Sequence, residues 1–414
     1  MTERRETVPV RGRAPATLRL WDTRFGPVIS DGILLRSDRP LALRWVGHRA
    51  SDEMTAMLGV MRARTLEEFR AALGGFAVPG QTMVAVEAGP AGRAARVVAA
   101  HLPRRANAPM SRLVCAPDEV WSLDDLLPGT AFPAAPEDIA VSANDRPGAA
   151  PVPVGFFFSP PDRVRRLRSL LDRAEPVGLE AMRAAQLDAA QPGALALRDR
   201  LLSRLPPSAP GQAAAVRALA NWDGCYDAGS QGALVFEAIV GALARQMVPP
   251  RTLALLSAIW SGRALIAQRI AEAPPNALAA ALRHAARVLR RRRTWGGAHR
   301  LALRHPFAAL PLVGKRHGLR DRPAAGGNDT LNKTGHPLVR GRHRVTYGAC
   351  ARHVSDLADP DANWFVLLGG QDGWLGSANT ADQVALWEAG EAIPVPLRPE
   401  AAHAWPHRTR LHPA

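Results

Sequence analysis

"LLGGQDGWLGSANTADQVALWEAGE" (residues 367–391) carries the clearest structural pattern in this chain. Apolar residues lead into a cluster of glycines, and a segment of helical periodicity follows, which predicts a strand, a turn and an amphipathic helix. The glycines allow two interpretations: they cradle a ligand, or they let the backbone pass close to another segment. We expect Val384, Leu386 and Trp387 to pack the helix on a sheet.

Patterns towards the N-terminus predict a mixture of strands and helix. Residues 18–48 alternate as strands do, and residues 51–75 change to helical periodicity. Within that helical part, Thr65 followed by Glu68 forms a capping box. Residues 81–103 contain two apolar runs joined by Gly-Pro-Ala-Gly, which predicts a hairpin.

The remainder of the chain predicts a long helical part followed by strands. A short strand is expected at 139–147, helices over 161–295, and strands again at 344–357 and 363–370. Because both ends are rich in strands, the order favours one α+β domain with a helical insertion at 161–295.

Composition excludes several classes of partner and location. A net charge of +16 suggests an anionic partner, but the arginines are scattered and aromatic residues make up only 5%, so we expect no nucleic acid. The longest apolar run, 232–248, carries Glu237 and Arg245, so we expect no membrane span. The polar start lacks the apolar core of a signal peptide, which predicts a cytoplasmic protein as the sequence is written.

Side chains able to perform chemistry mostly have simpler structural interpretations. Ser230 precedes a predicted helix, where serine caps the helix more often than it acts as a nucleophile. Asn144 and Asp145 in "SANDRP" either line a site or form a turn before proline. The cysteines (Cys115, Cys225 and Cys350) form no CxxC pair, and the histidines show no ligand spacing, so no metal site is expected.

Residues 356–397, "DLADPDANWFVLLGGQDGWLGSANTADQVALWEAGEAIPVPL", closely resemble the C-terminal part of the penicillin acylase (penicillin amidase) family. Other segments agree in the family's order, and the resemblance covers about residues 18–412. These segments are "TRFGPVISD", "LALRWVGH", "ARTLEEFRAAL", "SANDRP", "WDG", "RHPFAALPLVG", "GGNDTLNKTG" and "RVTYGACARHVSDLADP".

The resemblance implies an N-terminal-nucleophile hydrolase, an αββα sandwich of two antiparallel sheets. In this family a serine at the start of the large chain attacks, and its own α-amine acts as the base. An oxyanion hole that includes an Asn side chain stabilises the tetrahedral intermediate. The implied reaction is hydrolysis of a linear amide, such as the acyl side chain of a β-lactam or an acyl-homoserine lactone.

This chain departs from the family pattern at the nucleophile. The family's small chain and its nucleophilic serine would lie upstream of residue 18, so no Ser, Thr or Cys of this chain takes the serine's place. Thr2, exposed after removal of methionine, is chemically able to act but lies in a charged segment. We expect residues 1–17 to be a disordered tail and 18–414 to be a partial acylase domain, truncated at its N-terminal side.

The resemblance also assigns the remaining site residues. Thr82 stands where the oxyanion-hole Asn belongs, and a Thr hydroxyl has a shorter reach. Arg105 corresponds best to an arginine that helps to position substrate, with Arg104 as the alternative, and Asn144 is expected to contact substrate. The family's calcium is the only cofactor suggested, and most of its ligands would come from the upstream part.

Two functions remain open from the sequence. In the first, a separate polypeptide supplies the nucleophile segment, and the two chains together form an amidohydrolase. In the second, the chain is a catalytically inactive remnant or an interaction protein. An export signal on the upstream part would make the location periplasmic.

Overall fold

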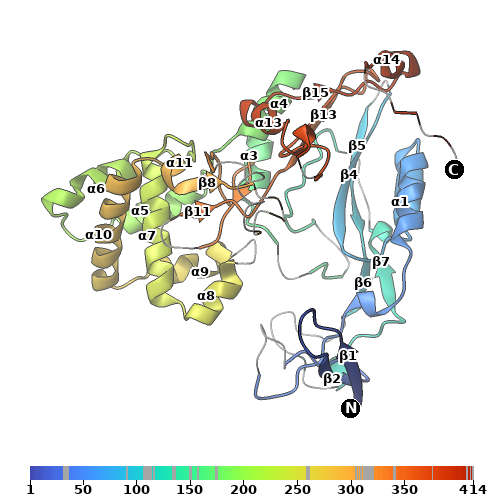
Figure 1. Cartoon of the computed structure of the whole chain (residues 1–414), viewed down its shortest axis with the longest axis horizontal. Coiled ribbons are helices and arrows are strands. Elements are labelled where there is room, and N and C mark those ends of the chain that lie inside the picture. The colour runs from blue at the N-terminus through green and yellow to red at the C-terminus, as the bar shows by residue number, and fades with distance from the viewer. Residues whose placement is uncertain are drawn as a thin grey trace. The chain divides into compact units, whose positions relative to one another are not determined.

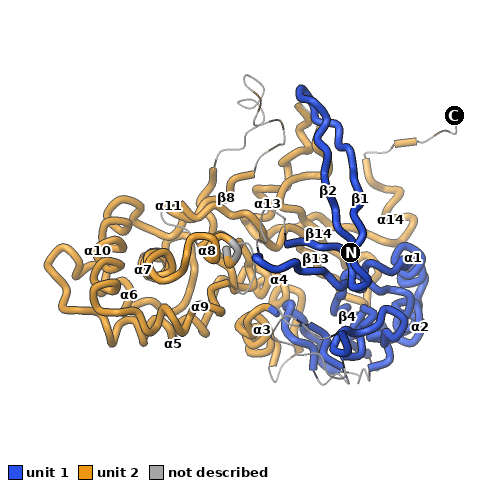
Figure 2. The backbone as a smooth tube through the Cα atoms, turned by 90° about the horizontal axis from the view of Figure 1, so that it is seen from below, with its two compact units in different colours: residues 1–158 blue, residues 159–414 orange. Residues whose placement is uncertain are grey.

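The computed structural model divides the chain into two compact units, residues 1–158 and 159–414 (Figure 2). It describes all residues outside the following ranges: 31–36, 90–91, 106–113, 115–116, 133–136, 149–151, 156–157, 173–175, 258–261, 304, 306, 308–309, 311–320, 339–341, 375, 407–408, 411 and 413–414. Cys115 of the sequence analysis therefore lies outside the described residues, whereas Cys225 and Cys350 are free thiols.

The first unit begins with a hairpin where we expected a disordered tail. Strand β1 (Thr2–Val8) pairs antiparallel with β2 (Ala16–Thr23), which continues to β3 (Gly26–Pro27). The carboxylate of Glu3 in β1 accepts hydrogen bonds from Arg19 in β2 at 3.0 Å, and this bonding lowers the pKa of Glu3 to about 2. Cross-strand charge pairing therefore organises a segment whose low apolar content predicted disorder.

Two helices pack on one face of a second hairpin in the same unit, and Figure 1 shows the first of them, α1, beside β4 and β5. Helices α1 (Glu53–Arg62) and α2 (Leu66–Leu73) pack on β4 (Gln81–Glu87) and β5 (Arg93–Ala99). The shared core contains Ala56, Leu73, Phe76, Val97 and Ala99. The predicted helix and hairpin are thus confirmed.

Local capping and short elements complete this unit. Thr65 caps α2 by accepting a hydrogen bond from the Glu68 amide at 3.1 Å, as predicted. The Glu68 carboxylate accepts from the Arg64 amide at 2.7 Å, and not from the Thr65 amide as a full capping box requires. Strand β6 (His101–Pro103) pairs with β7 (Leu126–Pro128). The remaining elements are short 3-10 helices: η1 (Val46–His48), η2 (Pro117–Glu119) and η3 (Gly129–Ala131).

The second unit is built around helix α7 (Gln231–Met247), whose residues Gly232–Ala244 are all buried. Helices α6 (Ala213–Ala220), α9 (Gly262–Ala271) and α10 (Pro275–Arg292) pack around it. Apart from Glu237, residues Gly232–Ala244 are apolar or glycine, so this part of α7 can be buried on every side. The other helices of this part are α3 (Asp162–Leu171), α4 (Leu179–Leu187), α5 (Ala194–Leu202), η4 (Pro210–Gln212), α8 (Pro250–Ser257) and α11 (Trp295–Ala298).

Short strands follow the helices. Strand β8 (His299–Leu301) lies between β9 (Arg322–Pro323) and β11 (His343–Arg344), and its pairing with β11 is parallel. The other pairs are antiparallel: β10 (Thr334–Gly335) with β12 (Tyr347–Gly348), and β13 (Ala351–Ser355) with β14 (Asn363–Leu367) and β15 (Ile393–Pro394). The helical elements near the C-terminus are η6 (Ala378–Thr380), α13 (Val384–Ala389) and α14 (Pro399–His403).

The α+β class is therefore confirmed, but the sheet arrangement differs from the expected pair of antiparallel sheets. The described residues form six sheets of two or three strands. The strand predicted at 344–357 is split into β11, β12 and β13, with Ala349 and Cys350 between the last two. No strand forms at 139–147; instead the Arg96 side chain reaches the Val141 carbonyl at 3.5 Å.

The glycines of the 367–391 stretch permit close approach of the backbone. A Cβ on Gly370 would lie 1.7 Å from the Asn379 carbonyl oxygen, and Gly369 has φ of +141°. The Gln383 side chain accepts a hydrogen bond from the Leu367 amide at 2.9 Å and so joins the end of β14 to the turn. Trp387 is buried and donates to the Ala349 carbonyl at 3.1 Å.

Replacing Gly370 with alanine is expected to lower the free energy of unfolding by about 3 kcal/mol, because the Cβ and the Asn379 carbonyl cannot occupy the same space. Urea unfolding followed by circular dichroism measures the loss. Gly229→Ala is the matched control, since a Cβ there meets nothing within 4 Å. Equal stability of the two variants would contradict this account of the turn.

Candidate active site

Thr82 lies at the start of β4, opposite Val98 on β5. Met83 packs towards α1 and α2, so side-chain alternation directs Thr82 to the opposite face of the hairpin. Thr82 is partly buried, and its hydroxyl makes no hydrogen bond with any residue that the structure describes. The hydroxyl is therefore available as a donor on this face.

Asn144 lies in an exposed turn and adopts a left-handed backbone conformation, with φ of 59°. It is Asp145, not Asn144, that bonds within the turn: its carboxylate accepts from the Ala143 amide at 2.9 Å. The Asn144 amide makes no hydrogen bond with the described part of the chain. A non-glycine residue held at positive φ costs free energy, and such residues cluster at functional sites.

Arg96, which the sequence analysis did not single out, joins these two positions. It lies on β5 opposite Val84, on the same face as Thr82. Its guanidinium donates to Glu137 at 2.6 Å and to the Val141 carbonyl, so the segment leading to Asn144 is attached to the hairpin that carries Thr82. Only the fold reveals this role, because Arg96 and Glu137 are 41 residues apart.

Arg105 follows strand β6 and is half-buried. Its guanidinium donates to the Pro153 carbonyl at 3.4 Å and lies 5.9 Å from the centre of the Trp121 ring. Burial lowers the pKa of Arg105. The alternative, Arg104, is instead exposed and pairs with Asp125 at 3.1 Å, so its environment is that of a surface ion pair.

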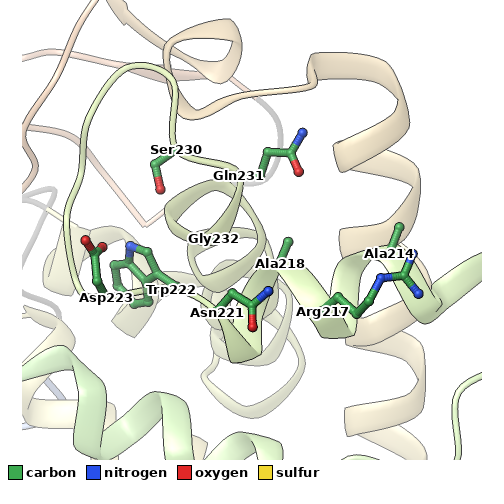
Figure 3. Close-up of a pocket in the computed structure, with 9 residues that line it drawn as sticks. All are labelled: Ala214, Arg217, Ala218, Asn221, Trp222, Asp223, Ser230, Gln231 and Gly232. Carbon is green, nitrogen blue, oxygen red and sulfur yellow. The ribbon is translucent and has the colours of Figure 1, made fainter.

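The second unit contains a pocket of about 470 Å³ beside the N-terminus of α7 (Figure 3). The residues lining it are Ala214, Arg217, Ala218, Asn221, Trp222, Asp223, Ser230, Gln231 and Gly232. Ser230 accepts a hydrogen bond from the Ala233 amide at 3.1 Å and caps α7, which confirms the capping interpretation. Burial and Asp227 raise the pKa of nearby Cys225 to about 12, so its thiol stays protonated at neutral pH.

A buried ionic network lies elsewhere in this unit. Arg263 on α9 donates to Glu237 at 2.6 Å and to Asp329 at 2.9 Å. The same guanidinium donates to Gln191, and the Tyr226 hydroxyl donates to Glu237 at 2.7 Å. All five side chains are buried, so the network ties α7 and α9 to the loop that carries Asp329. Its members are too far apart in sequence for a motif to reveal it.

Three histidines surround the buried Trp295. The His299 ring stacks on Trp295 at 4.5 Å, and His336 and His343 lie at 5.3 and 5.2 Å from it. Burial lowers the pKa of all three, that of His299 to about 4. Within the described residues, no group of three or more His, Cys, Asp or Glu side chains could hold a metal ion.

This histidine cluster predicts acid destabilisation. Below pH 6.5 the unfolded chain binds protons that the folded rings exclude, so stability is full above pH 6.5 and falls as pH drops towards 4. His299 alone accounts for about 3 kcal/mol at pH 4. Urea unfolding at pH 7.5, 6, 5 and 4 measures the slope. We expect His336→Leu to reduce the dependence of the free energy of unfolding on pH, and the exposed control His353→Leu to leave it unchanged. A wild-type free energy of unfolding that stays constant from pH 7.5 to pH 4 would contradict this expectation.

No helix in the described ranges is long and apolar enough to cross a membrane.

Comparison with known proteins identifies the family of this chain. A model described as penicillin amidase matches residues 1–404. The chain belongs to the penicillin amidase family. The match includes the N-terminal hairpin, which the sequence resemblance had left out.

One relative and one solved structure give the extent of the likeness of this penicillin amidase family member to known proteins. The chain is 28% identical over 425 residues to penicillin acylase 2 proenzyme from Pseudomonas sp. (strain SE83), covering 95% of this chain and 54% of that protein. It therefore spans about half the length of the relative. Its fold resembles that of a thermostable penicillin G acylase from Alcaligenes faecalis in an orthorhombic form, with a TM-score of 0.59 and 18% identity, over 100% of this chain and 82% of the other.

Proposed function

We propose that this chain is one part of an amidohydrolase that cleaves a linear amide, of the type found in the acyl side chain of a β-lactam or in an acyl-homoserine lactone. The observation that carries the proposal is the match of the penicillin amidase model to residues 1–404. The relative named penicillin acylase 2 supports an acylated amine as the substrate class.

Three residues of the first unit would bind and polarise the amide. Thr82 would donate its hydroxyl to the developing oxyanion, because that hydroxyl has no described partner. Asn144 would hold the acyl group through its side-chain amide, which has no partner among the described residues. The Arg105 guanidinium would position a carboxylate or carbonyl of the substrate.

The nucleophile would come from a second polypeptide that carries an N-terminal serine. Within this chain, Ser230 is engaged as a helix cap, and Thr2 begins an exposed hairpin strand. Neither side chain has a described basic partner that would activate it. The relative's description as a proenzyme, and its greater length, support a larger assembly.

A panel of chromogenic acyl-anilides tests this function. The chain would be assayed alone and together with the part of the Pseudomonas proenzyme that lies outside the match. Hydrolysis only by the combination, lost when the added polypeptide's N-terminal serine is changed to alanine, is the expected result. The Thr at position 82 favours the alternative of an inactive remnant, and absence of hydrolysis in both samples would establish it.

A further inference from the structure

The pocket of the second unit, about 470 Å³ in volume, carries opposite charges at its two ends. Figure 3 shows the Arg217 side chain at one end and the Asp223 carboxylate at the other, with Asn221 between them. Among the residues that the structure describes, none forms an ion pair or a hydrogen bond with the Arg217 guanidinium. The two charges therefore do not neutralise each other across the pocket.

The backbone fixes the positions of both charged residues. Arg217 and Asn221 are one turn apart at the end of α6, so they lie on the same face of that helix. Asp223 lies in the turn that follows, and its carboxylate accepts a hydrogen bond from the Cys225 amide at 2.9 Å. Because this bond engages one carboxylate oxygen, the other oxygen can accept a hydrogen bond from a ligand.

Trp222 gives the pocket a rigid wall. It is 3% exposed, its indole N–H donates to the Cys225 carbonyl at 2.8 Å, and its ring lies 4.7 Å from that of Phe236. A Cβ on Gly232 would lie 2.3 Å from the Trp222 Cβ, so the start of α7 packs directly against this wall. Its volume lies in the range of small-molecule sites, which are usually formed before the ligand binds.

We propose that this pocket binds a small zwitterion, an amino acid or a short peptide, whose carboxylate pairs with Arg217 and whose ammonium group pairs with Asp223. A guanidinium forms two parallel hydrogen bonds with a carboxylate, and an ammonium group is a hydrogen-bond donor that a carboxylate accepts. A ligand with a single charge would leave one end of the pocket without a partner.

The groups between the two ends suit the middle of such a ligand. The side-chain amides of Asn221 and Gln231 line the pocket and have no partner within the described part of the chain. Each amide can donate to the carbonyl and accept from the N–H of a peptide group. All these residues belong to the second unit, whereas Thr82, Arg105 and Asn144 belong to the first, so the inference does not depend on the proposed function.

Calorimetric titration of the full chain with glycine, glycylglycine and triglycine tests this inference. The series also distinguishes an amino acid from a peptide, because only a ligand of the right length reaches both charges. We expect at least one of the three to bind at concentrations up to about 10 mM. Acetylating the amine or amidating the carboxyl group of the best binder should each weaken binding by about tenfold or more, since each removes one charged contact.

Two conservative variants assign the two ends. Arg217→Gln and Asp223→Asn should each weaken binding of the best peptide by about tenfold or more. Asn keeps the oxygen that accepts from the Cys225 amide, so the turn should be unchanged. Arg217→Gln should also bind the free and the amidated peptide equally, and Asp223→Asn the free and the acetylated peptide. Arg245→Gln, at an exposed position of α7 outside the pocket, is the matched control and should bind as the wild type does.

Three results would overturn the inference: none of the three compounds binds, the acetylated or the amidated peptide binds as tightly as the free one, or either pocket variant keeps the wild-type affinity. Tight binding of the acetylated peptide would show a simple anion site at Arg217 in place of a site for a zwitterion. The measurement involves no amide hydrolysis, so its outcome is separate from that of the acyl-anilide assay.

Discussion

Arg263→Met is expected to lower the free energy of unfolding by about 3–5 kcal/mol, the cost of leaving buried charge without a partner. The substitution removes the only cation that the structure describes between Glu237 and Asp329, and both carboxylates stay buried. A loss of this size approaches the whole stability of an ordinary domain. Urea unfolding of the full chain measures it.

Two controls isolate the ionic contribution. Arg269→Met removes an exposed arginine from the same helix and should change stability by less than about 0.5 kcal/mol. Adding Glu237→Gln and Asp329→Asn to Arg263→Met removes the stranded charges and should recover part of the loss. A variant Arg263→Met that is as stable as the wild type would show that the network is not needed for the fold.

In the two-chain enzyme that we propose, with Thr82 as the oxyanion-hole donor, Thr82→Val is expected to lower kcat by about 10²–10³-fold, the usual effect of removing such a donor. Valine keeps the volume and the branched Cβ that suit a strand, so the hairpin should be unchanged. Thr82→Asn introduces the donor that the family pattern has at this position and should retain activity. Steady-state hydrolysis of an acyl-anilide measures both variants.

The control for this prediction is Thr17→Val, which makes the same change at an exposed position on β2. It should leave kcat within about twofold of the wild type, since it removes no donor near the site. If Thr82→Val also stayed within that range, Thr82 would not be the oxyanion donor. The site would then have to draw its donor from elsewhere, for example from the side-chain amide of Asn144.

Sequence patterns over short stretches correctly predicted the elements that depend on interactions between residues close in sequence. The cap at Thr65, the β4–β5 hairpin and helix α7 all follow from short-range periodicity and turn chemistry. Strand β1 was missed because its residues are charged and its order depends on pairing between Glu3 and Arg19. The strand expected at 139–147 did not form. Its alternating apolar residues, Val141 and Ala143, are buried without backbone pairing to a neighbouring strand.

The candidate site could be predicted only from the family resemblance. Thr82 and Asn144 are ordinary residues in composition and spacing, and their shared feature, a polar group without a described partner, is visible only in the fold. The roles of Arg96 and Arg263 depend on contacts between segments 41 and 66 residues apart. Sequence patterns over a few residues cannot predict such contacts, because tertiary packing determines them.

The most direct test of the account is to find the residue that an acyl-mimicking sulfonyl fluoride modifies. The reagent would be added to this chain combined with the part of the Pseudomonas proenzyme outside the match, and both polypeptides would be mapped by mass spectrometry. We predict a single label on the N-terminal serine of the added polypeptide and none on this chain. A label on Thr2 or Ser230 would place the nucleophile within this chain and contradict the account.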